Sequence, residues 1–340
     1  MSPHSNSNRL GFGIMGTGNI ARQFAAGVNA SDLCRLTAVG SRTQASAQKF
    51  ADEFGVKNVH ASYEALIADP DVHAIYVSLP NTMHHEWTIR SLEAGKHVLC
   101  EKPLACSAPE AVEMYATARR CGLTLVEAFM YRAHPQTRAV LDTIASGEIG
   151  QVKLVRTSFC YRVRQWQGNV RFDPSLAGGA LMDVGCYCID FSNLIAGGEP
   201  VEVRSVARMH ESGVDEQTTV AMKYASGVTA EFTCGMMVQQ DNTAHICGDE
   251  GYITIGWPWK PSPGNAKFDV RRSIPPRQDA TQKIGASTER TIEVPVTQPL
   301  YAIEADEFAR VIGGQSMPFV SPEQSIATAR VIDQIRASFQ

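Results

Sequence analysis

The feature that most constrains this chain of 340 residues is a short apolar run that passes directly into a glycine-rich turn. Residues 10–15 are typical of a buried strand, and residues 20–28 carry apolar side chains at helical spacing. The turn and the first helical residues are Gly16, Thr17, Gly18, Asn19, Ile20 and Ala21. Gly16 permits a tight turn, Gly18 lets a pyrophosphate approach the backbone, and the helix N-terminus favours negative charge. We therefore predict a dinucleotide site that includes residues 16–20.

The residues after the second predicted strand, 36–39, indicate which dinucleotide is bound. An NAD site favours an acid there to accept from the ribose 2′-hydroxyl, whereas this chain has Ser41 and Arg42. A guanidinium and a hydroxyl suit a 2′-phosphate through charge-assisted hydrogen bonds. We predict NADP, with NAD as the alternative if Arg42 is only a solvated residue at the start of the helix 44–54.

Strands then alternate with helices as far as residue 126, which predicts a parallel sheet with helices on both faces. The loop that follows the predicted strand 74–78 contains Leu79, Pro80, Asn81 and His84. Ligands bind outside the carboxyl ends of such strands, so Asn81 and His84 could contact the nicotinamide end of the cofactor. The alternative for His84 is an ordinary histidine at the start of a helix.

A second turn with reactive side chains follows the predicted strand 97–100. There the apolar run ends in an acid, a base and a proline: Glu101, Lys102 and Pro103. Pro103 biases Lys102 away from helical backbone, so the lysine should project at the carboxyl edge of the sheet. We predict that Lys102 serves in chemistry there, and that Glu101 either contacts the nicotinamide ribose or steadies the turn. The alternative is a solvated ion pair at the exit of an ordinary strand.

The pattern changes near residue 128, which predicts a second domain. We expect a disordered lead over residues 1–8, a Rossmann domain over 9–128 and an α+β substrate and oligomerisation domain over 129–340. The second domain should carry an open, mainly antiparallel sheet, with strands near 152–161, 201–209, 218–224, 228–233 and 252–255. A loop over 257–263 and a polar, mobile segment over 274–290 are expected, and the last helix, 322–338, could pack back on the first domain.

Residues 181–195 of this second part predict a helix with two distinct stripes. Leu181, Val184, Cys188, Phe191 and Ile195 form the apolar stripe, and Asp183, Tyr187 and Asp190 lie on another face. The polar stripe could simply face water. Tyrosine is a costly choice for a merely solvated position, however, and Gly178, Gly179 and Gly185 indicate close backbone approach. We therefore expect Asp183 and Tyr187 to belong to a site.

Cations and aromatic residues are mixed just before this stretch, at Arg162, Trp166, Arg171 and Phe172. They could line a site for a polyol substrate or only cover the sheet.

Composition excludes several functions. The formal net charge of −4 gives no basic footprint for nucleic acid or an anionic membrane surface. The nine cysteines include no Cys-x-x-Cys pair, so reduced thiols are expected rather than disulfides or a zinc site. The polar N-terminus lacks the apolar core of a signal peptide, and no run is long enough to span a bilayer, so we expect a cytoplasmic protein.

Taken in order, these motifs resemble those of the Gfo/Idh/MocA oxidoreductases. The resemblance rests on Gly16-x-Gly18-x-x-Ala21, Pro80-Asn81-x-x-His84, Glu101-Lys102-Pro103 and Asp183-x-Gly185-x-Tyr187. Relatives of inositol dehydrogenase have a histidine where this chain has Tyr187. Tyr187, the segment from Glu127 to Gln136 and the run Asn242-Thr243-Ala244 together resemble the branch that contains dimeric dihydrodiol dehydrogenase and NADP-linked D-xylose 1-dehydrogenase.

That branch implies oxidation of a cyclic sugar or trans-diol hydroxyl with NADP, without a metal. It also implies a homodimer or homotetramer paired through the open sheet, with Lys102, Asp183 and Tyr187 at the reactive centre. The chemistry agrees, because alcohol oxidation needs a base for the hydroxyl proton and a cation near the developing alkoxide. A free tyrosine has a pKa of about 10, which an adjacent ammonium lowers.

Two alternatives stay open. The first is a keto-sugar or anhydro-sugar reductase of the same family, in which the same residues donate a proton and hold the substrate. The second is a dinucleotide-sensing regulator without catalysis, against which Lys102 and Tyr187 argue. The sequence names neither the substrate nor the direction of reaction.

Overall fold

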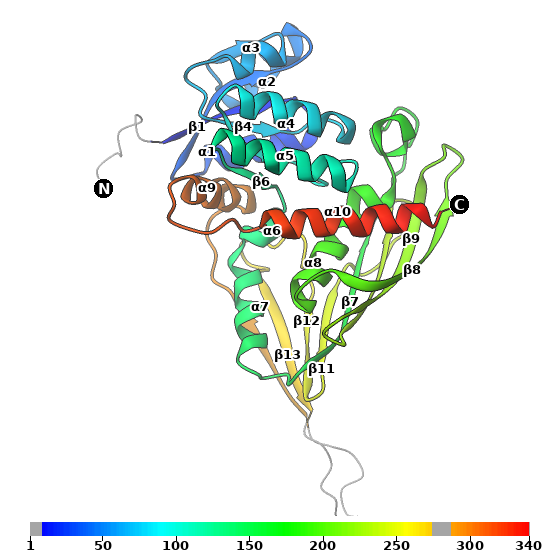
Figure 1. Ribbon diagram of the computed structural model, residues 1–340. Coiled ribbons are helices and arrows are strands. Elements are labelled where there is room, and N and C mark those ends of the chain that lie inside the picture. Colours follow the sequence, from blue (N-terminus) through cyan, green and yellow to red (C-terminus); the bar gives the residue numbers. More distant parts are fainter. Residues whose placement is uncertain (1–8, 274–286, 340) are drawn as a thin grey trace, which may run out of the picture. The chain divides into compact units, whose positions relative to one another are not determined.

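The structure is a computed structural model that describes residues 9–273 and 287–339 (Figure 1). The chain divides into two compact units. The first consists of Met1–Ala133 and Gln298–Ala329, and the second of His134–Thr297 and Arg330–Gln340. The first unit thus takes in a segment that is more than 160 residues further along the chain, and the last helix, α10 (Pro322–Ala337), is divided between the two.

The first unit is built on a six-stranded sheet in the spatial order β3-β2-β1-β4-β5-β6. The strands are β1 (Leu10–Met15), β2 (Cys34–Gly40), β3 (Asn58–His60), β4 (Ala74–Val77), β5 (His97–Cys100) and β6 (Leu125–Glu127). All neighbouring strands are parallel. This is the strand order of a doubly wound dinucleotide-binding fold, in which a crevice forms where the order reverses, between β1 and β4.

Helices cover both faces of this sheet (Figure 1). They are α1 (Asn19–Asn29), α2 (Gln44–Phe54), α3 (Tyr63–Ile67), α4 (His84–Glu93), α5 (Ala108–Cys121), α6 (Met130–Ala133) and α9 (Leu300–Ile312). One core joins apolar residues of α3, α4 and α5 to the sheet. The other contains Phe12, Phe24, Phe50 and Phe308, from β1, α1, α2 and α9. The predicted Rossmann architecture is confirmed.

Helix α9 is part of the first unit although it lies far along the chain. A Cβ on Gly27 of α1 would lie 2.5 Å from Cβ of Tyr301, so the two helices approach as closely as a glycine permits. Asp306 of α9 accepts a hydrogen bond from Leu33 N–H at 3.1 Å. The ring of Phe308 lies 5.8 Å from that of Phe12. These contacts join residues 273 to 296 positions apart, which no local pattern reports.

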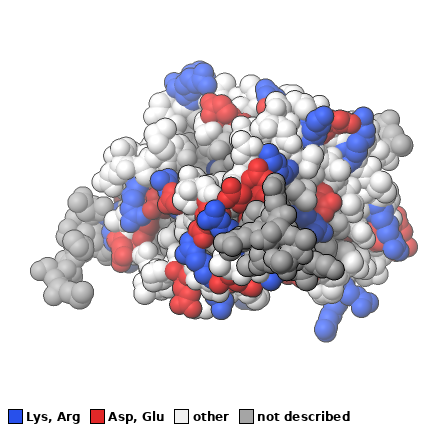
Figure 2. Space-filling model, turned by 90° about the horizontal axis from the view of Figure 1, so that it is seen from below, with Lys and Arg blue, Asp and Glu red and all other residues white. Residues whose placement is uncertain are grey.

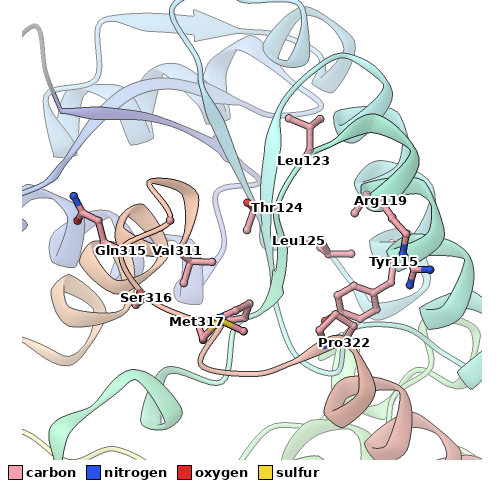
Figure 3. Close-up of a pocket in the computed structure, with 13 residues that line it drawn as sticks. Tyr115, Arg119, Leu123, Thr124, Leu125, Val311, Gln315, Ser316, Met317 and Pro322 are labelled. Carbon is pink, nitrogen blue, oxygen red and sulfur yellow. The ribbon is translucent and has the colours of Figure 1, made fainter.

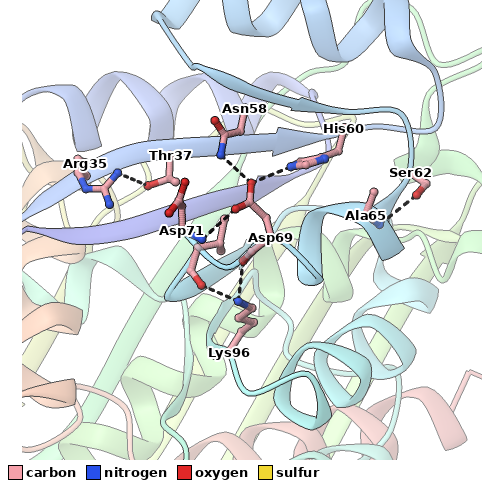
Figure 4. Close-up of polar contacts among 10 residues, drawn as sticks. Arg35, Thr37, Asn58, His60, Ser62, Ala65, Asp69, Asp71 and Lys96 are labelled. Atoms are coloured by element: carbon pink, nitrogen blue, oxygen red, sulfur yellow. Dashed lines mark hydrogen bonds and ion pairs between the residues drawn. The ribbon is translucent and has the colours of Figure 1, made fainter.

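A polar cluster fixes the connection between α3 and β4 (Figure 4). The Asp69 carboxylate is 2.8 Å from Asn58 Nδ2 and 2.9 Å from His60 Nε2. The buried Lys96 ammonium donates to the backbone carbonyls of Asp69 and Val72, at 2.8 and 2.7 Å. Because each member has partners within the cluster, we assign it a structural role.

The second unit is built on an eight-stranded sheet in the order β14-β13-β12-β11-β7-β10-β9-β8. Its strands are β7 (Val152–Cys160), β8 (Pro200–Met209), β9 (Asp215–Tyr224), β10 (Thr229–Gly235), β11 (Ala244–Gly248), β12 (Gly251–Ile255), β13 (Lys267–Ser273) and β14 (Ser287–Glu293). Strands β7 and β10 run parallel, and the other neighbours are antiparallel. Helix α7 (Pro135–Ala145) precedes the sheet, and α8 (Cys186–Ala196) packs on β7 and β10. The predicted open, mainly antiparallel sheet is confirmed.

The sequence did not predict strands β11, β13 and β14. The expectation of a polar, mobile segment over residues 274–290 is wrong for its last four residues, which begin β14. Residues 274–286 lie outside the described part of the chain. Most β14 side chains are exposed, so backbone pairing with β13 holds the strand, and it carries no apolar alternation to detect.

Two further observations concern surfaces. Within residues 9–273 and 287–339, no helix has both the length and the apolar composition needed to cross a membrane. Figure 2 shows basic and acidic side chains interspersed on one face. The ion pairs of the second unit include Arg290 with Glu148, at 2.5 Å, and Arg272 with Glu250, at 2.9 Å.

Candidate functional site

The parallel register brings the predicted cofactor residues of the first unit to one edge. Met15 pairs with Gly40 and with Val77, and Val77 pairs with Cys100. The glycine turn follows β1, and Ser41 and Arg42 follow β2. The loop from Leu79 to His84 follows β4, and the turn that begins at Glu101 follows β5. All of them therefore share the carboxyl edge of the sheet, where ligands bind in this class of fold.

The turn between β1 and α1 fits a pyrophosphate. Gly16 has φ +102°, and a Cβ there would lie 3.1 Å from the backbone oxygen of Ser78. A Cβ on Gly18 would meet nothing within 4 Å, so the space beside the turn is open. Helix α1 begins at Asn19 with no side-chain cap, which leaves its first N–H groups available to an anion.

The end of β2 offers a hydroxyl and a cation. Ser41 is buried, and Arg42 is exposed at the surface. Burial raises the pKa of the neighbouring Tyr63, and the positive charge of Arg42 opposes that rise, which places the guanidinium near the phenol. A hydroxyl and a guanidinium at this strand end match the chemistry of a ribose 2′-phosphate.

His84 ties two of these loops together. Its Nε2 lies 2.9 Å from the carbonyl oxygen of Leu79, and its Nδ1 lies 2.9 Å from that of Pro103. The ring is buried at the start of α4. Burial lowers its pKa, the two carbonyls act in the opposite direction, and the Lys102 charge lowers the pKa further. His84 thus fixes the loop after β4 to the turn that carries Lys102.

Glu101 steadies that same turn. Its Oε2 accepts the backbone N–H of Lys102 at 3.2 Å, and its Oε1 accepts the hydroxyl of Tyr76. The Glu101 side chain is buried, whereas Lys102 is half-buried, and the Lys102–Pro103 peptide bond is cis. These two hydrogen bonds fit the predicted role of Glu101 within the turn, and its contact with the nicotinamide ribose stays a prediction.

In the second unit, residues 181–196 do not form one regular helix. A π-helical turn, Leu181–Gly185, precedes α8. Tyr187 is 3% exposed and Asp190 is 1% exposed, so the alternative that their stripe faces water is wrong for both. The Tyr187 ring lies 5.2 Å from that of Phe159 and 5.9 Å from that of Trp259. Helix α8 packs on β7 and β10, and the rings of Phe159 and Trp259 lie against Tyr187.

Asp183 is the centre of a charged network in this unit. Its Oδ1 lies 2.9 Å from Arg171 Nε, and its Oδ2 accepts the hydroxyl of Tyr161. The Asp183 charge raises the pKa of Arg171, and Tyr161 and Tyr187 add to the effect. Burial and then Asp183 raise the pKa of Tyr161. Three residues predicted for different roles, Asp183, Tyr187 and Arg171, are therefore neighbours.

Asp215 accepts a hydrogen bond from the first residue of the π-helical turn. Its Oδ2 accepts the N–H of Leu181 at 2.8 Å and the hydroxyl of Thr218 at 2.7 Å. A Cβ on Gly179, which has φ +120°, would lie 2.2 Å from Asp215 Oδ1, so the carboxylate occupies the space a side chain would need. Burial raises the pKa of Asp215 to about 6, against the effect of these two donors.

Sequence reasoning missed both Tyr161 and Asp215. Tyr161 directly follows β7, and Asp215 begins β9 after a turn, so each resembled an ordinary strand-end residue. The one available signal was Gly178-Gly179, because a close approach needs a partner that fills the space.

The other predicted substrate residues have different surroundings. Phe172 is buried, and its ring lies 4.8 Å from that of His210. Trp166 packs on the same histidine at 4.7 Å. Arg162 is exposed and forms an isolated bridge with Met237. Trp166 and Phe172 thus make a small aromatic cluster beside the Arg171–Asp183 pair in sequence, and Arg162 is not part of it.

A cavity of about 680 Å³ in the first unit lies away from this chemistry (Figure 3). Tyr115, Leu123, Leu125 and Met317 contribute to its lining. Leu125 is the first residue of β6, so the cavity adjoins the amino end of that strand, opposite the edge that carries Glu101. Among the described residues, no three His, Cys, Asp or Glu side chains are grouped as a metal ion would require.

Comparison with known proteins gives the class to which this arrangement belongs. Residues 10–129 match the model of an oxidoreductase family with an NAD-binding Rossmann fold, GFO_IDH_MocA, and residues 137–254 match the GFO/IDH/MocA C-terminal domain. The chain belongs to the Gfo/Idh/MocA oxidoreductase family. The predicted family is therefore confirmed, and the prediction of an oxidoreductase with it.

Three relatives of known activity are similar to this chain over most of its length. The chain is 33% identical to D-xylose 1-dehydrogenase (NADP(+)) 2 of Haloferax volcanii over 330 residues, 96% of each chain. It is 35% identical to trans-1,2-dihydrobenzene-1,2-diol dehydrogenase of Homo sapiens over 257 residues, 74% of this chain and 76% of that protein. A solved structure of a 3-ketoreductase from Actinomadura kijaniata with NADP and TDP-benzene matches with TM-score 0.84 and 32% identity, covering 97% and 98% of the two chains.

Proposed function

We propose that this protein is an NADP-dependent oxidoreductase that transfers a hydride between nicotinamide and a hydroxyl-bearing carbon of a cyclic sugar or trans-diol. The observation that carries the proposal is the network Tyr161–Asp183–Arg171 beside the buried Tyr187. A merely structural helix would not require a carboxylate with two dedicated donors next to a buried phenol. The xylose and dihydrodiol dehydrogenases among the relatives support the substrate class.

The cofactor assignment rests on the carboxyl edge of the first sheet. Residues 16–20 would hold the pyrophosphate, Ser41 and Arg42 the 2′-phosphate, and the loop from Leu79 to His84 the nicotinamide end, together with Glu101 and Lys102. When bound, NADP accepts or gives the hydride. The NADP-bound ketoreductase and the NADP-linked xylose dehydrogenase support this choice.

The chain's own residues would handle the proton. In oxidation, Tyr187 would accept the proton of the reacting hydroxyl, and the Lys102 ammonium would stabilise the developing alkoxide. Asp183, held by Arg171 and Tyr161, orients a substrate hydroxyl. We assign no step to a metal ion, because Tyr187 would supply the base and Lys102 the positive charge.

A second candidate runs the same chemistry in reverse. The relatives include a 3-ketoreductase and a dTDP-3,4-didehydro-2,6-dideoxy-alpha-D-glucose 3-reductase of Actinomadura kijaniata, which is 37% identical over 256 residues. As a keto-sugar or anhydro-sugar reductase, the protein would use Tyr187 as the proton donor and Lys102 to polarise the carbonyl. Arg162, Trp166, Arg171 and Phe172 stay candidates for substrate selection in either direction.

We also propose a homodimer or homotetramer that forms through the open sheet of the second unit. In β9, buried and exposed residues alternate, so one face of that strand is not covered by the unit's own core. Sedimentation velocity tests this proposal, and a monomer at micromolar concentration would refute it.

One assay separates the two directions. Absorbance at the reduced-nicotinamide band is followed with pentoses, hexoses, inositols and trans-diols plus NADP or NAD, and then with keto-sugars plus the reduced cofactors. Turnover with alcohols and NADP supports the dehydrogenase, and turnover only with ketones supports the reductase. No turnover with any substrate of either panel would contradict both.

A further inference from the structure

Helix α9 buries two acidic side chains, Asp306 and Glu304, that differ in their hydrogen-bond partners. Asp306 accepts hydrogen bonds from Leu33 N–H and from Gln298 Nε2, both at 3.1 Å, and from the hydroxyl of Ser31. Glu304 is 0% exposed, and neither of its carboxyl oxygens has a hydrogen-bond partner among the described residues. A buried carboxylate without donors is costly, so Glu304 needs a different explanation from Asp306.

The surroundings of Glu304 are acidic and aromatic. The charge that acts on it is that of Glu101, which already accepts hydrogen bonds from the Tyr76 hydroxyl and the Lys102 N–H. Tyr76 is stacked on Phe24 of α1, with ring centroids 3.8 Å apart. The hydroxyl of Tyr301, one turn before Glu304, lies 3.4 Å from Gln23 Oε1. The donors near this pair of acids are thus directed to Glu101 or elsewhere.

The cations of the adjoining helices are also engaged elsewhere. Arg132 of α6 donates to Gln324 at 2.9 Å, and Arg22 of α1 pairs with Glu53. Burial raises the pKa of Glu304 well above its usual value, and the charge of Glu101 raises it further. Two carboxylates cannot both ionise in such a place, so one proton stays with the pair.

We propose that Glu304 is a neutral carboxylic acid at physiological pH and a positioning residue for the turn that carries Lys102. Glu101 then holds the single negative charge, which both Tyr76 and the Lys102 N–H stabilise. If Glu304 also ionised, the two carboxylates would repel each other. Glu101 would then lose these hydrogen bonds, and the turn that carries Lys102 would no longer be fixed. The effect of Glu304 on turnover rests on the proposed function, whereas the protonation of Glu304 does not.

Infrared difference spectroscopy tests the protonation directly. Wild-type protein should show a protonated-carboxyl C=O band at neutral pH that Glu304→Gln lacks. Asp306→Asn, the matched variant two residues along the same helix, should retain that band. A spectrum in which Glu304→Gln removes no protonated-carboxyl band would overturn the proposal.

The pH dependence of NADP binding tests the positioning role. The amide of Glu304→Gln mimics the neutral acid, so we expect its Kd for NADP to stay within about twofold of wild type near neutral pH. At alkaline pH, wild type should lose affinity as Glu304 ionises, whereas Glu304→Gln should lose less. Identical alkaline profiles for the two proteins would remove the positioning role even if the infrared band is present. Lost NADP binding in wild type at every pH would instead contradict the proposed function.

Discussion

Arg171 Nε lies 2.9 Å from Asp183 Oδ1, so a residue expected to bind substrate and a residue expected at the reactive centre form an ion pair. The pair is asymmetric, because the Arg171 side chain is 46% exposed and that of Asp183 is 15% exposed. Solvent therefore weakens the attraction, and the main effect of Arg171 is to fix the direction of the carboxylate. Tyr161 fixes the other oxygen.

Replacing Arg171 by glutamine should consequently lower turnover by about tenfold, the loss that one charge-assisted hydrogen bond implies, with NADP affinity unchanged. The measurement is steady-state kinetics together with a fluorescence titration of NADP. Arg164→Gln is the control, since Arg164 is an exposed arginine of the same segment. Equal losses in both variants would show that local charge, rather than the pair with Asp183, is responsible.

Tyr187→Phe and Lys102→Met should each reduce turnover by about 100-fold or more, the range expected for loss of acid–base or electrostatic catalysis. NADP binding should survive Tyr187→Phe, because the substitution removes one hydroxyl and keeps the ring that contacts Phe159 and Trp259. Single-turnover kinetics with saturating NADP separates chemistry from binding. A Tyr187→Phe enzyme with wild-type turnover would eliminate this residue as the acid–base group.

Arg42→Ala should weaken NADP binding by about 10- to 100-fold and leave NAD binding nearly unchanged, because only NADP carries the 2′-phosphate. Isothermal titration with both dinucleotides provides the comparison. Lys49→Ala, an exposed cation on α2, controls for the general loss of positive charge. A clear wild-type preference for NAD would contradict the assignment of the 2′-phosphate to Ser41 and Arg42.

Asp215 should make stability depend on pH. Burial raises its folded pKa to about 6 from an ordinary value of 3.8, so the folded protein keeps a proton that the unfolded chain releases. The stability of the wild type therefore falls as pH rises from about 4 to about 6, by at most about 3 kcal/mol, and the loss persists above that range. Asp215→Asn cannot titrate, so its stability relative to wild type should increase across this window and then level off.

Urea unfolding at several pH values measures this difference. Glu211→Gln, a change at an exposed acid, controls for the loss of one negative charge. A constant difference between wild type and Asp215→Asn from about pH 4 to about pH 7 would show that Asp215 is not the titrating group.

Local patterns were sufficient to predict much of the fold and the strand ends that carry the candidate cofactor residues. The strand–turn–helix at Gly16 and the strand that ends before Glu101 are short-range features, and parallel pairing then places their carboxyl ends at one edge. Strand β14 escaped detection because its side chains are mostly exposed and backbone pairing alone defines it.

The sequence by itself determined which chemical groups are available: the glycine turn, Ser41 and Arg42, the Glu101-Lys102 turn, and Asp183 with Tyr187. Only the tertiary structure decided which of them are neighbours. The partners of Asp183 lie 12 and 22 residues away, Asp215 reaches Leu181 across 34 residues, and α9 brings Glu304 to the first unit from far along the chain. Hydrophobic periodicity reports which face of an element is buried but not what it is buried against, so the pairing of buried polar groups emerges only from packing.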